Sequence, residues 1–242
     1  MKFRDIFILA ITNPILLLRK FLNRIKYVYL FHIKKDFSKT DPTGWWRDKG
    51  DETLRLNYPS LNSNSIVFDL GGYEGDFAYK INNMYDCTVY LFEPHPLFYK
   101  KCVTRFKENP KVIPFNIGLS DEDGIFELSD SKDGSSFLHK KIGSGSSIKC
   151  QVREFFKVME ELKVSHIHLI KLNIEGSEYQ LLEHMAKNNM LHIVDDYQIQ
   201  FHNFIDGAVE RRDFIVNSLS ESHHRTWCYL FFWENWEINS IR

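Results

Sequence analysis

The stretch "FDLGGYEGDF", residues 68–77, constrains the fold of this 242-residue chain more than any other segment. An apolar run ends at Asp69, and Gly71, Gly72 and Gly75 follow before a helix-like segment begins. Glycine readily adopts a positive φ and lets another group approach the backbone closely. The stretch therefore predicts a strand that turns sharply into a helix, with a ligand lying against the turn.

Strand-like and helix-like patterns alternate after this turn. Strands are expected at residues 65–70, 88–94, 111–120, 165–176 and 197–204, with an accessory strand at 124–128 and one or two aromatic strands within 226–238. Helices are expected between them, at residues 75–85, 96–109, 177–188 and 209–219. Such alternation predicts an α/β fold with a mostly parallel central sheet and helices on both faces.

Charge divides the chain into two parts. Residues 1–35 contain eight Lys or Arg and one acid, although the net charge of the whole chain is −1. We expect residues 1–40 to form a basic amphipathic helical extension and residues 41–242 to form the main domain. The apolar run at residues 6–18 is shorter than the about 20 residues of a membrane-spanning helix. An apolar face beside a basic one suits peripheral contact with an anionic membrane surface. The alternative is packing on the same domain or on a second subunit, so a homo-oligomer is left open.

Composition also narrows the partners of the main domain. It carries a net negative charge, which disfavours nucleic acid. The four cysteines are far apart and form no CxxC pair, which indicates reduced thiols and a cytoplasmic location. No zinc-ligand spacing is present, so no metal is expected.

The spacing of the glycines favours S-adenosylmethionine over a dinucleotide as the ligand at this turn. Dinucleotide sites need glycines at i, i+2 and i+5, whereas here they fall at i, i+1 and i+4. Asp69, Gly71 and Gly75 instead fit the D-x-G-x-x-x-G arrangement of sites for S-adenosylmethionine. At the end of the next strand, Glu93 is placed to accept hydrogen bonds from both ribose hydroxyls of an adenosine.

Polar residues also follow the third expected strand. Asn116 and Ser120 lie there, and they are candidates to contact an adenine. Asn and Ser are also turn-forming residues, so a purely structural role of both side chains stays open as the alternative.

Four segments in this order resemble the FkbM-type S-adenosylmethionine-dependent methyltransferases: "VFDLGGYEGDFA", "VYLFEPHP", "VIPFNIGLSDEDG" and "IKLNIEGSEYQLL". The resemblance extends from about residue 45 to residue 236. It implies a Rossmann-like class I methyltransferase fold, S-adenosylmethionine as cofactor, and O-methyl transfer, commonly to sugar hydroxyls of polysaccharides or secondary metabolites. Asn173 departs from the pattern, because the family usually has an acid there. Tyr73 stands where many methyltransferases of this fold have a third glycine, and its ring is expected to flank the methionine part of the cofactor.

Methyl transfer to a hydroxyl requires alignment of the acceptor oxygen and removal of its proton. His202 is the expected general base, because its ordinary pKa lies near neutrality. Glu175 is expected to orient His202 or to hold a second substrate hydroxyl. A structural histidine and a carboxylate favoured by a helix N-terminus are the alternatives.

Aromatic residues near the end of the chain suggest a sugar site. Trp233 and Trp236 could stack on a sugar ring, with Glu234 between them binding hydroxyls. The alternative is that both tryptophans fill the core and sheet edge.

These patterns predict an O-methyltransferase that acts on a hydroxyl of a saccharide or glycan, including a lipid-linked polysaccharide. A methyltransferase of a non-sugar small molecule is the second possibility. A third is a cofactor-binding or scaffolding protein without catalysis, which Asn173 alone favours.

Overall fold

The computed structural model describes residues 43–129 and 147–240. The chain divides into two units, Met1–Asp41 and Pro42–Arg242, and every described residue belongs to the second. The predicted basic extension therefore lies outside the described residues. No helix within the described part has the length and apolar character that a membrane span requires.

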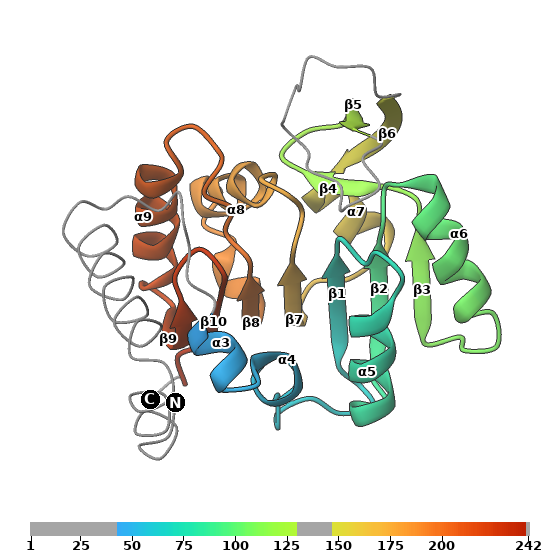
Figure 1. The fold of residues 1–242 in the computed structure, drawn as a ribbon, viewed down its shortest axis with the longest axis horizontal. Coiled ribbons are helices and arrows are strands. Elements are labelled where there is room, and N and C mark those ends of the chain that lie inside the picture. Colours follow the sequence, from blue (N-terminus) through green and yellow to red (C-terminus); the bar gives the residue numbers. More distant parts are fainter. Residues whose placement is uncertain (1–42, 130–146, 241–242) are drawn as a thin grey trace, which may run out of the picture. The chain divides into compact units, whose positions relative to one another are not determined.

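Seven strands form the central sheet, in the order β3-β2-β1-β7-β8-β10-β9 (Figure 1). The first five in this order are parallel, and β10 runs antiparallel between β8 and β9. The bounds are β1 Ile66–Leu70, β2 Thr88–Phe92, β3 Val112–Phe115, β7 Ile167–Leu172, β8 Val194–Ile199, β9 His223–Tyr229 and β10 Trp233–Ile238. The chain leaves β1 toward β2 on one side and later returns to β7 on the other. The carboxyl ends of β1 and β7 therefore flank the point where ligands bind in open α/β sheets.

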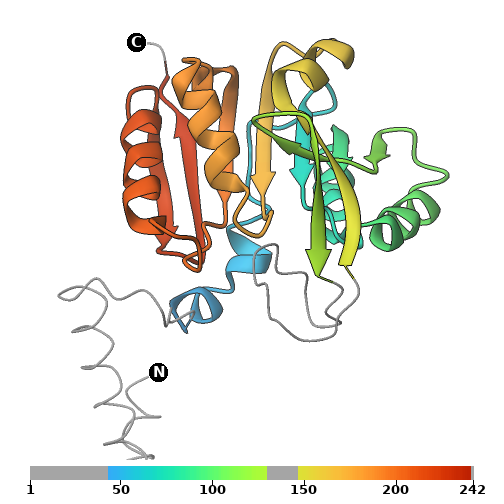
Figure 2. The ribbon, with the colours of Figure 1, turned by 90° about the horizontal axis from the view of Figure 1, so that it is seen from above.

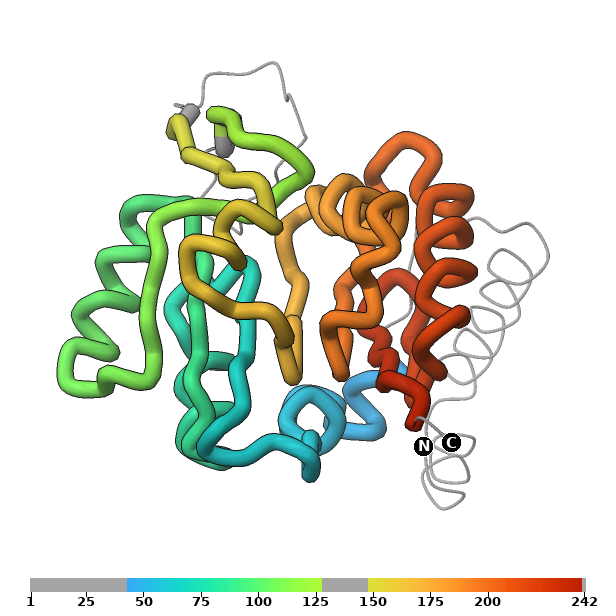
Figure 3. Tube along the Cα trace, turned by 180° about the vertical axis from the view of Figure 1, so that it is seen from behind, coloured from blue at the N-terminus to red at the C-terminus, as the bar shows by residue number. Residues whose placement is uncertain are grey.

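Helices cover both faces of this sheet, which confirms the predicted α/β class. One face packs on α5 and α6, because Val67, Val89 and Leu169 share a buried cluster with residues of those helices. The opposite face carries Phe68, whose ring contacts Phe155 of α7. Figures 1 and 3 show α4 and α5 in front of the sheet and α8 and α9 behind it. The bounds are α3 Thr43–Arg47, α4 Gly50–Thr53, α5 Asp76–Tyr85, α6 Pro96–Arg105, α7 Phe155–Glu161, α8 Glu178–Lys187 and α9 Ala208–Leu219, with a 3-10 turn η2 at Leu191–Ile193.

A small second sheet lies beyond the carboxyl ends of β1 and β2 (Figures 1 and 2). It consists of β4 (Gly118–Ser120), β6 (Ser147–Glu154) and β5 (Gly124–Ser129), in that order. The single strand expected at 111–120 is thus wrong, because the chain bends after β3 and continues as β4 in the other sheet. Asn116 fixes the bend: its amide donates to the carbonyls of Glu93 (3.0 Å) and Pro94 (2.9 Å).

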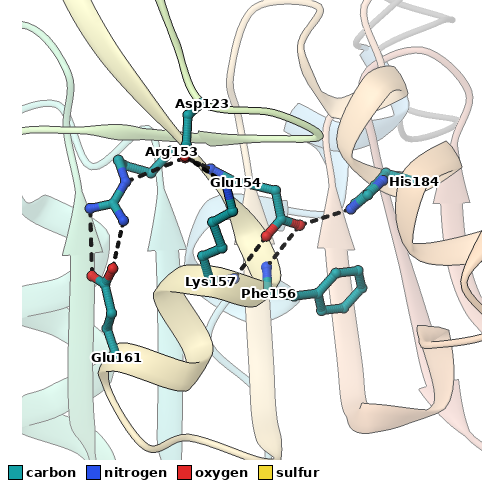
Figure 4. A network of polar contacts seen from close by, with 7 residues as sticks. All are labelled: Asp123, Arg153, Glu154, Phe156, Lys157, Glu161 and His184. Carbon is teal, nitrogen blue, oxygen red and sulfur yellow. Dashed lines mark hydrogen bonds and ion pairs between the residues drawn. The ribbon is translucent and has the colours of Figure 1, made fainter.

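A polar network fastens the small sheet to the helices below it (Figure 4). The carboxylate of Glu154 accepts hydrogen bonds from the first amides of α7 and lies 2.8 Å from Nε2 of His184 on α8. Asp123 accepts from the Glu154 amide and from the Lys157 ammonium. These bonds hold β4 and β6 in a defined place over the end of the main sheet.

A second buried network holds the segment that follows α4 against the main sheet. The Tyr58 hydroxyl donates to Oδ1 of Asn235 (2.8 Å) and accepts from Nε2 of Gln198 (2.6 Å). The Gln198 amide also bonds the backbone and side chain of Arg55. The N-terminal part of the domain is thereby tied to β8 and β10.

Replacing Tyr58 with Phe tests this attachment. The substitution leaves Oδ1 of Asn235 buried without its donor, so we expect the free energy of unfolding to fall by about 1–3 kcal/mol in urea denaturation. The matched control is Tyr79→Phe on α5, where the side chain is exposed and a change of at most about 0.5 kcal/mol is expected. Equal midpoints for both variants would contradict a structural role for the Tyr58 hydroxyl.

Candidate active site

A cavity of about 260 Å³ opens at the carboxyl edge of the central sheet. Residues that follow β1, β2 and β7 form one side of it, and the small sheet forms the other. The lining comprises Leu70, Gly71, Tyr73, Phe92, Glu93, Pro94, Gly118, Leu119, Phe126, Val152, Asn173, Ile174, Glu175 and Ser177. The cavity therefore lies at the switch point between β1 and β7.

The glycine turn serves the protein's own backbone as well as a ligand. Gly71 has a φ of 76°, and a Cβ there would lie 2.0 Å from the carbonyl oxygen of Asn173. Side chains added at Gly72 and Gly75 would meet Leu91 and Phe106. Only Gly71 of the three lines the cavity. Gly72 and Gly75, predicted as cofactor contacts, thus allow close packing behind the turn.

A buried ion pair supports the turn from below. Nζ of Lys171 lies 2.9 Å from Oδ1 of Asp69 and donates to the carbonyls of Gly71 (2.8 Å) and Leu70 (3.3 Å). Both side chains are almost fully buried. Burial lowers the pKa of Lys171, and the charge of Asp69 opposes this effect. Asp69, predicted to contact the cofactor, does not line the cavity and acts through Lys171 on the shape of the turn.

Glu93 is the acidic group at the cavity wall beyond β2. Its Oε2 accepts from the Tyr73 amide (2.7 Å) and its Oε1 from the His95 amide (2.9 Å). Each carboxylate oxygen keeps a second lone-pair site, so both remain able to accept from a ribose diol. Burial raises the pKa of Glu93 to about 7, against the lowering effect of the two amides. The Tyr73 ring is half exposed at the cavity and packs 4.3 Å from the ring of Phe98.

Neither predicted adenine contact reaches the cavity among the described residues. The Asn116 amide is used by two backbone carbonyls, and the Ser120 hydroxyl donates to Asp121. Gly118 and Leu119, which lie between them, line the wall instead. The placement therefore matches the turn-forming interpretation of both side chains.

The turn between β7 and α8 carries a charged cluster. Glu175 has a φ of 54°, a conformation that costs free energy for a residue with a Cβ and that concentrates at functional sites. Glu175 lines the cavity, and its Oε2 lies 3.7 Å from Nε2 of His202. Nδ1 of His202 lies 3.0 Å from Oε1 of Glu178, which is completely buried. The sequence brought His202 and Glu175 together correctly, whereas it gave no role to Glu178.

The charges of this cluster depend on one another. Burial, the largest single influence, lowers the pKa of His202, but the hydrogen bond and charge of Glu178 and the charge of Glu175 outweigh it, so the pKa is raised. Burial raises the pKa of Glu175, and the charge of His202 opposes that change. His202 does not line the cavity, whereas Glu175 does. The group in position to meet a substrate is therefore Glu175.

The structure buries the three residues of the predicted sugar site, Trp233, Glu234 and Trp236. The Trp233 ring lies beneath the Arg55 guanidinium at 4.2 Å, and Trp236 is buried as well. Glu234 forms a bidentate pair with Arg212 at 2.9 and 2.7 Å inside the protein. None of the three lines the cavity. They fill the interior around β10, as the core-packing alternative described.

One group of described residues has ligand atoms close enough to hold a metal: His166, His168 and Asp195. It lies at the amino ends of β7 and β8, at the opposite edge from the cavity. Nδ1 of His168 accepts a hydrogen bond from the Ile66 amide, so the neutral ring carries its proton on Nε2 and offers no free lone pair. This group therefore plays no part in the candidate active site.

The strand order, the glycine turn after β1 and the carboxylate after β2 define a Rossmann-like methyltransferase. The model of the methyltransferase FkbM domain matches residues 66–231, and the chain belongs to this family. The predicted family and fold class are thereby confirmed. No curated protein matches the sequence.

Solved structures with a similar fold include several methyltransferases. An rRNA methylase from Streptococcus thermophilus is 11% identical, with 74% of this chain and 90% of that chain covered and a TM-score of 0.47. M. capricolum TrmK in complex with S-adenosylhomocysteine is 11% identical, with 77% and 68% covered and a TM-score of 0.40. Aeropyrum pernix fibrillarin with natively bound S-adenosylmethionine is 8% identical, with 76% and 70% covered and a TM-score of 0.43.

S-adenosylmethionine is the cofactor of this family, and the cavity fits it. Glu93 offers two acceptor oxygens for the ribose, and Gly71 lines the same cavity. Oδ1 of Asn173 is buried at the wall without a hydrogen-bond partner among the described residues. A buried acceptor of this kind is satisfied by a donor on a ligand, such as an ammonium or a hydroxyl.

Cofactor affinity should depend on pH through Glu93. Ribose hydroxyls donate to the ionised carboxylate, so binding favours the ionised form and weakens as pH falls through about 7. We expect the dissociation constant of S-adenosylmethionine, measured by calorimetry, to rise roughly tenfold between pH 8 and pH 6. In Glu93→Gln the affinity should be weak and independent of pH. A flat profile in the unchanged protein would show that Glu93 does not hold the ribose.

Glu234→Gln distinguishes a core role from a sugar-binding role. The change leaves the buried Arg212 guanidinium without its counter-charge, so the free energy of unfolding should fall by about 3–5 kcal/mol. Glu237→Gln, on the same strand but exposed, is the control and should change stability by at most about 0.5 kcal/mol. If Glu234→Gln were as stable as the control, the buried pair would not support β10.

Proposed function

We propose that this protein transfers a methyl group from S-adenosylmethionine to a hydroxyl of a sugar or glycan. The observation that carries the proposal is Glu175, which lines the cavity from a strained turn and whose carboxylate lies 3.7 Å from His202. Asn173 and Ser177 line the same part of the wall, so hydroxyl-binding groups gather there. The resemblance of the sequence to sugar O-methyltransferases of the FkbM type supports the substrate class.

The residues around the cavity divide the work between the two ligands. Gly71 and Glu93 would hold the nucleoside, and Asn173 offers an acceptor to its amino-acid part or to the substrate. The bound cofactor supplies a methyl group that is already activated on a positively charged sulfur. The acceptor hydroxyl must then be aligned with that methyl group, and its proton must be removed as the new C–O bond forms.

Glu175 is the proton acceptor in this proposal. Its carboxylate takes the hydroxyl proton and returns it to solvent, to which the side chain is 28% exposed. His202 donates from Nδ1 to Glu178 and presents Nε2 toward Glu175, so its positive charge lowers the pKa of Glu175 against the larger raising effect of burial. This reverses the roles expected from the sequence, where His202 was the base and Glu175 its support.

The attachment of the glycan to a lipid and the contact of the extension with an anionic membrane both remain predictions. They depend on the basic residues of the first 40 positions. A non-catalytic scaffold is less consistent with a cluster in which a charged group is held at the cavity by a strained turn. A small hydroxylated molecule that is not a sugar would use the same residues.

Glu175→Gln tests the assignment. The amide keeps the shape but cannot accept the proton, so kcat should fall by about 10²–10⁴ while the affinity for S-adenosylmethionine changes less than about threefold. Methyl transfer from the labelled cofactor to a panel of mono- and oligosaccharides provides the measurement. The matched control is Glu210→Gln, an exposed position on α9, which should retain full activity.

The same assay separates the other functions. Transfer to hydroxylated small molecules without transfer to any saccharide would overturn the substrate class. Cofactor binding without transfer to any acceptor would support the non-catalytic alternative. A Glu175→Gln variant with normal turnover would require another base.

A further inference from the structure

We propose that Glu178 is a positioning residue for the reaction: it anchors His202, and His202 in turn holds Glu175 toward the cavity. The proposal rests on the function proposed above and assigns the residue on which the geometry of the base depends. Glu178 does not line the cavity and forms no hydrogen bond with Glu175 among the described residues. Its side-chain bonds to His202 give it a positioning role, and its negative charge also raises the pKa of Glu175 directly.

Burial is the first argument. Glu178 is 0% exposed, and a carboxylate inside a protein is stable only if its charge is compensated. Its Oε2 accepts from the Gly176 amide (2.8 Å), and its Oε1 lies within 3.0 Å of both the amide and Nδ1 of His202. These partners belong to the two loops that follow β7 and β8. The carboxylate therefore joins those two loops at the edge of the cavity.

Helix capping does not account for this arrangement. An acid in the first turn of a helix is favoured by the helix dipole, but such an acid needs no burial. Ser177, at the N-cap of α8, makes no side-chain cap bond. Glu178 does not replace it, because its oxygens bond a residue before the helix and a residue 24 positions later in the chain.

The contact with His202 fixes the orientation and charge of the imidazole. An ionised carboxylate only accepts hydrogen bonds, so Nδ1 of His202 must carry a proton toward Glu178. The Tyr179 hydroxyl donates to the His202 carbonyl (2.8 Å), which holds the backbone as well. Nε2 is thereby directed at Glu175, 3.7 Å away.

The charged groups around His202 all act in one direction. Glu178 on α8 and Glu175 on the preceding turn both favour the imidazolium. Arg211 on α9 also interacts electrostatically with Glu178, and it is paired with Glu183. Without the charge of Glu178, the pKa of the His202 imidazolium should fall. Glu175 would then lose the neighbouring positive charge, and this loss raises its pKa. It would also lose the smaller direct effect of the Glu178 charge, and that loss lowers its pKa. Because the His202 effect is the larger, a higher pH would be needed to ionise Glu175.

Glu178→Gln tests the inference in the full-length protein, with a readout that needs no substrate. We expect the pKa of the His202 ring to fall by roughly one to three pH units. The pKa is measured by NMR titration, and the His202→Gln variant assigns the His202 signal. In methyl transfer, the acidic limb of kcat/KM should shift upward. Glu210→Gln, at an exposed position on α9, is the control, and it should change neither profile.

A second variant keeps the test decisive if Glu178→Gln fails to fold. Glu178→Asp retains the charge, so its His202 titration should remain above that of a free imidazole. An unchanged His202 titration in a folded Glu178→Gln, or a titration in Glu178→Asp that matches free imidazole, would overturn the inference. Failure of the proposed function is a distinct result, because it appears as absence of transfer to every acceptor while the titration is measured without one.

Discussion

The buried contact between Lys171 and the end of β1 underlies the whole site. One ammonium compensates Asp69 and binds two carbonyls of the glycine turn, so the carboxyl ends of β1 and β7 are held at a fixed separation. A buried ion pair of this kind adds little net stability compared with an apolar pair. Its value here is geometric, because the turn that carries Gly71 and the turn that carries Glu175 both begin at the strands that it joins.

Two carboxylates face the cavity from these turns and are prepared differently. Glu93 is fixed by backbone amides alone, whereas Glu175 is held beside a histidine whose charge depends on another acid. The first arrangement suits a binding group that must stay in place. The second suits a group that exchanges a proton, because the neighbouring charge can adjust its proton affinity. The division between binding and chemistry thus follows from the partners of each acid.

Local patterns were sufficient to predict the fold but only part of the site. Alternating strands and helices identify the sheet, and the position of Glu93 after a strand predicts its place at the wall. Glu178 was missed because its partner lies 24 residues away and an acid at a helix start has an ordinary explanation. The sequence predicted a sugar site at Trp233, Glu234 and Trp236 because residue types alone do not show whether side chains are buried. Glu234 is explained by its ion pair with Arg212 on α9. The bend between β3 and β4 depends on the side chain of Asn116, and the pattern of apolar residues in the sequence does not show its contacts.

The amides of Tyr73 and His95 have a consequence for how tightly a nucleoside can be held. Their hydrogen bonds fix the Glu93 side chain within the folded protein itself, so its rotamer freedom is lost when the chain folds. A ligand that arrives later meets acceptors already aimed at its diol, and association carries no further entropic penalty for ordering them. The rigid half of the pocket can therefore act as a template, which leaves adaptation to the acceptor to the residues around Glu175.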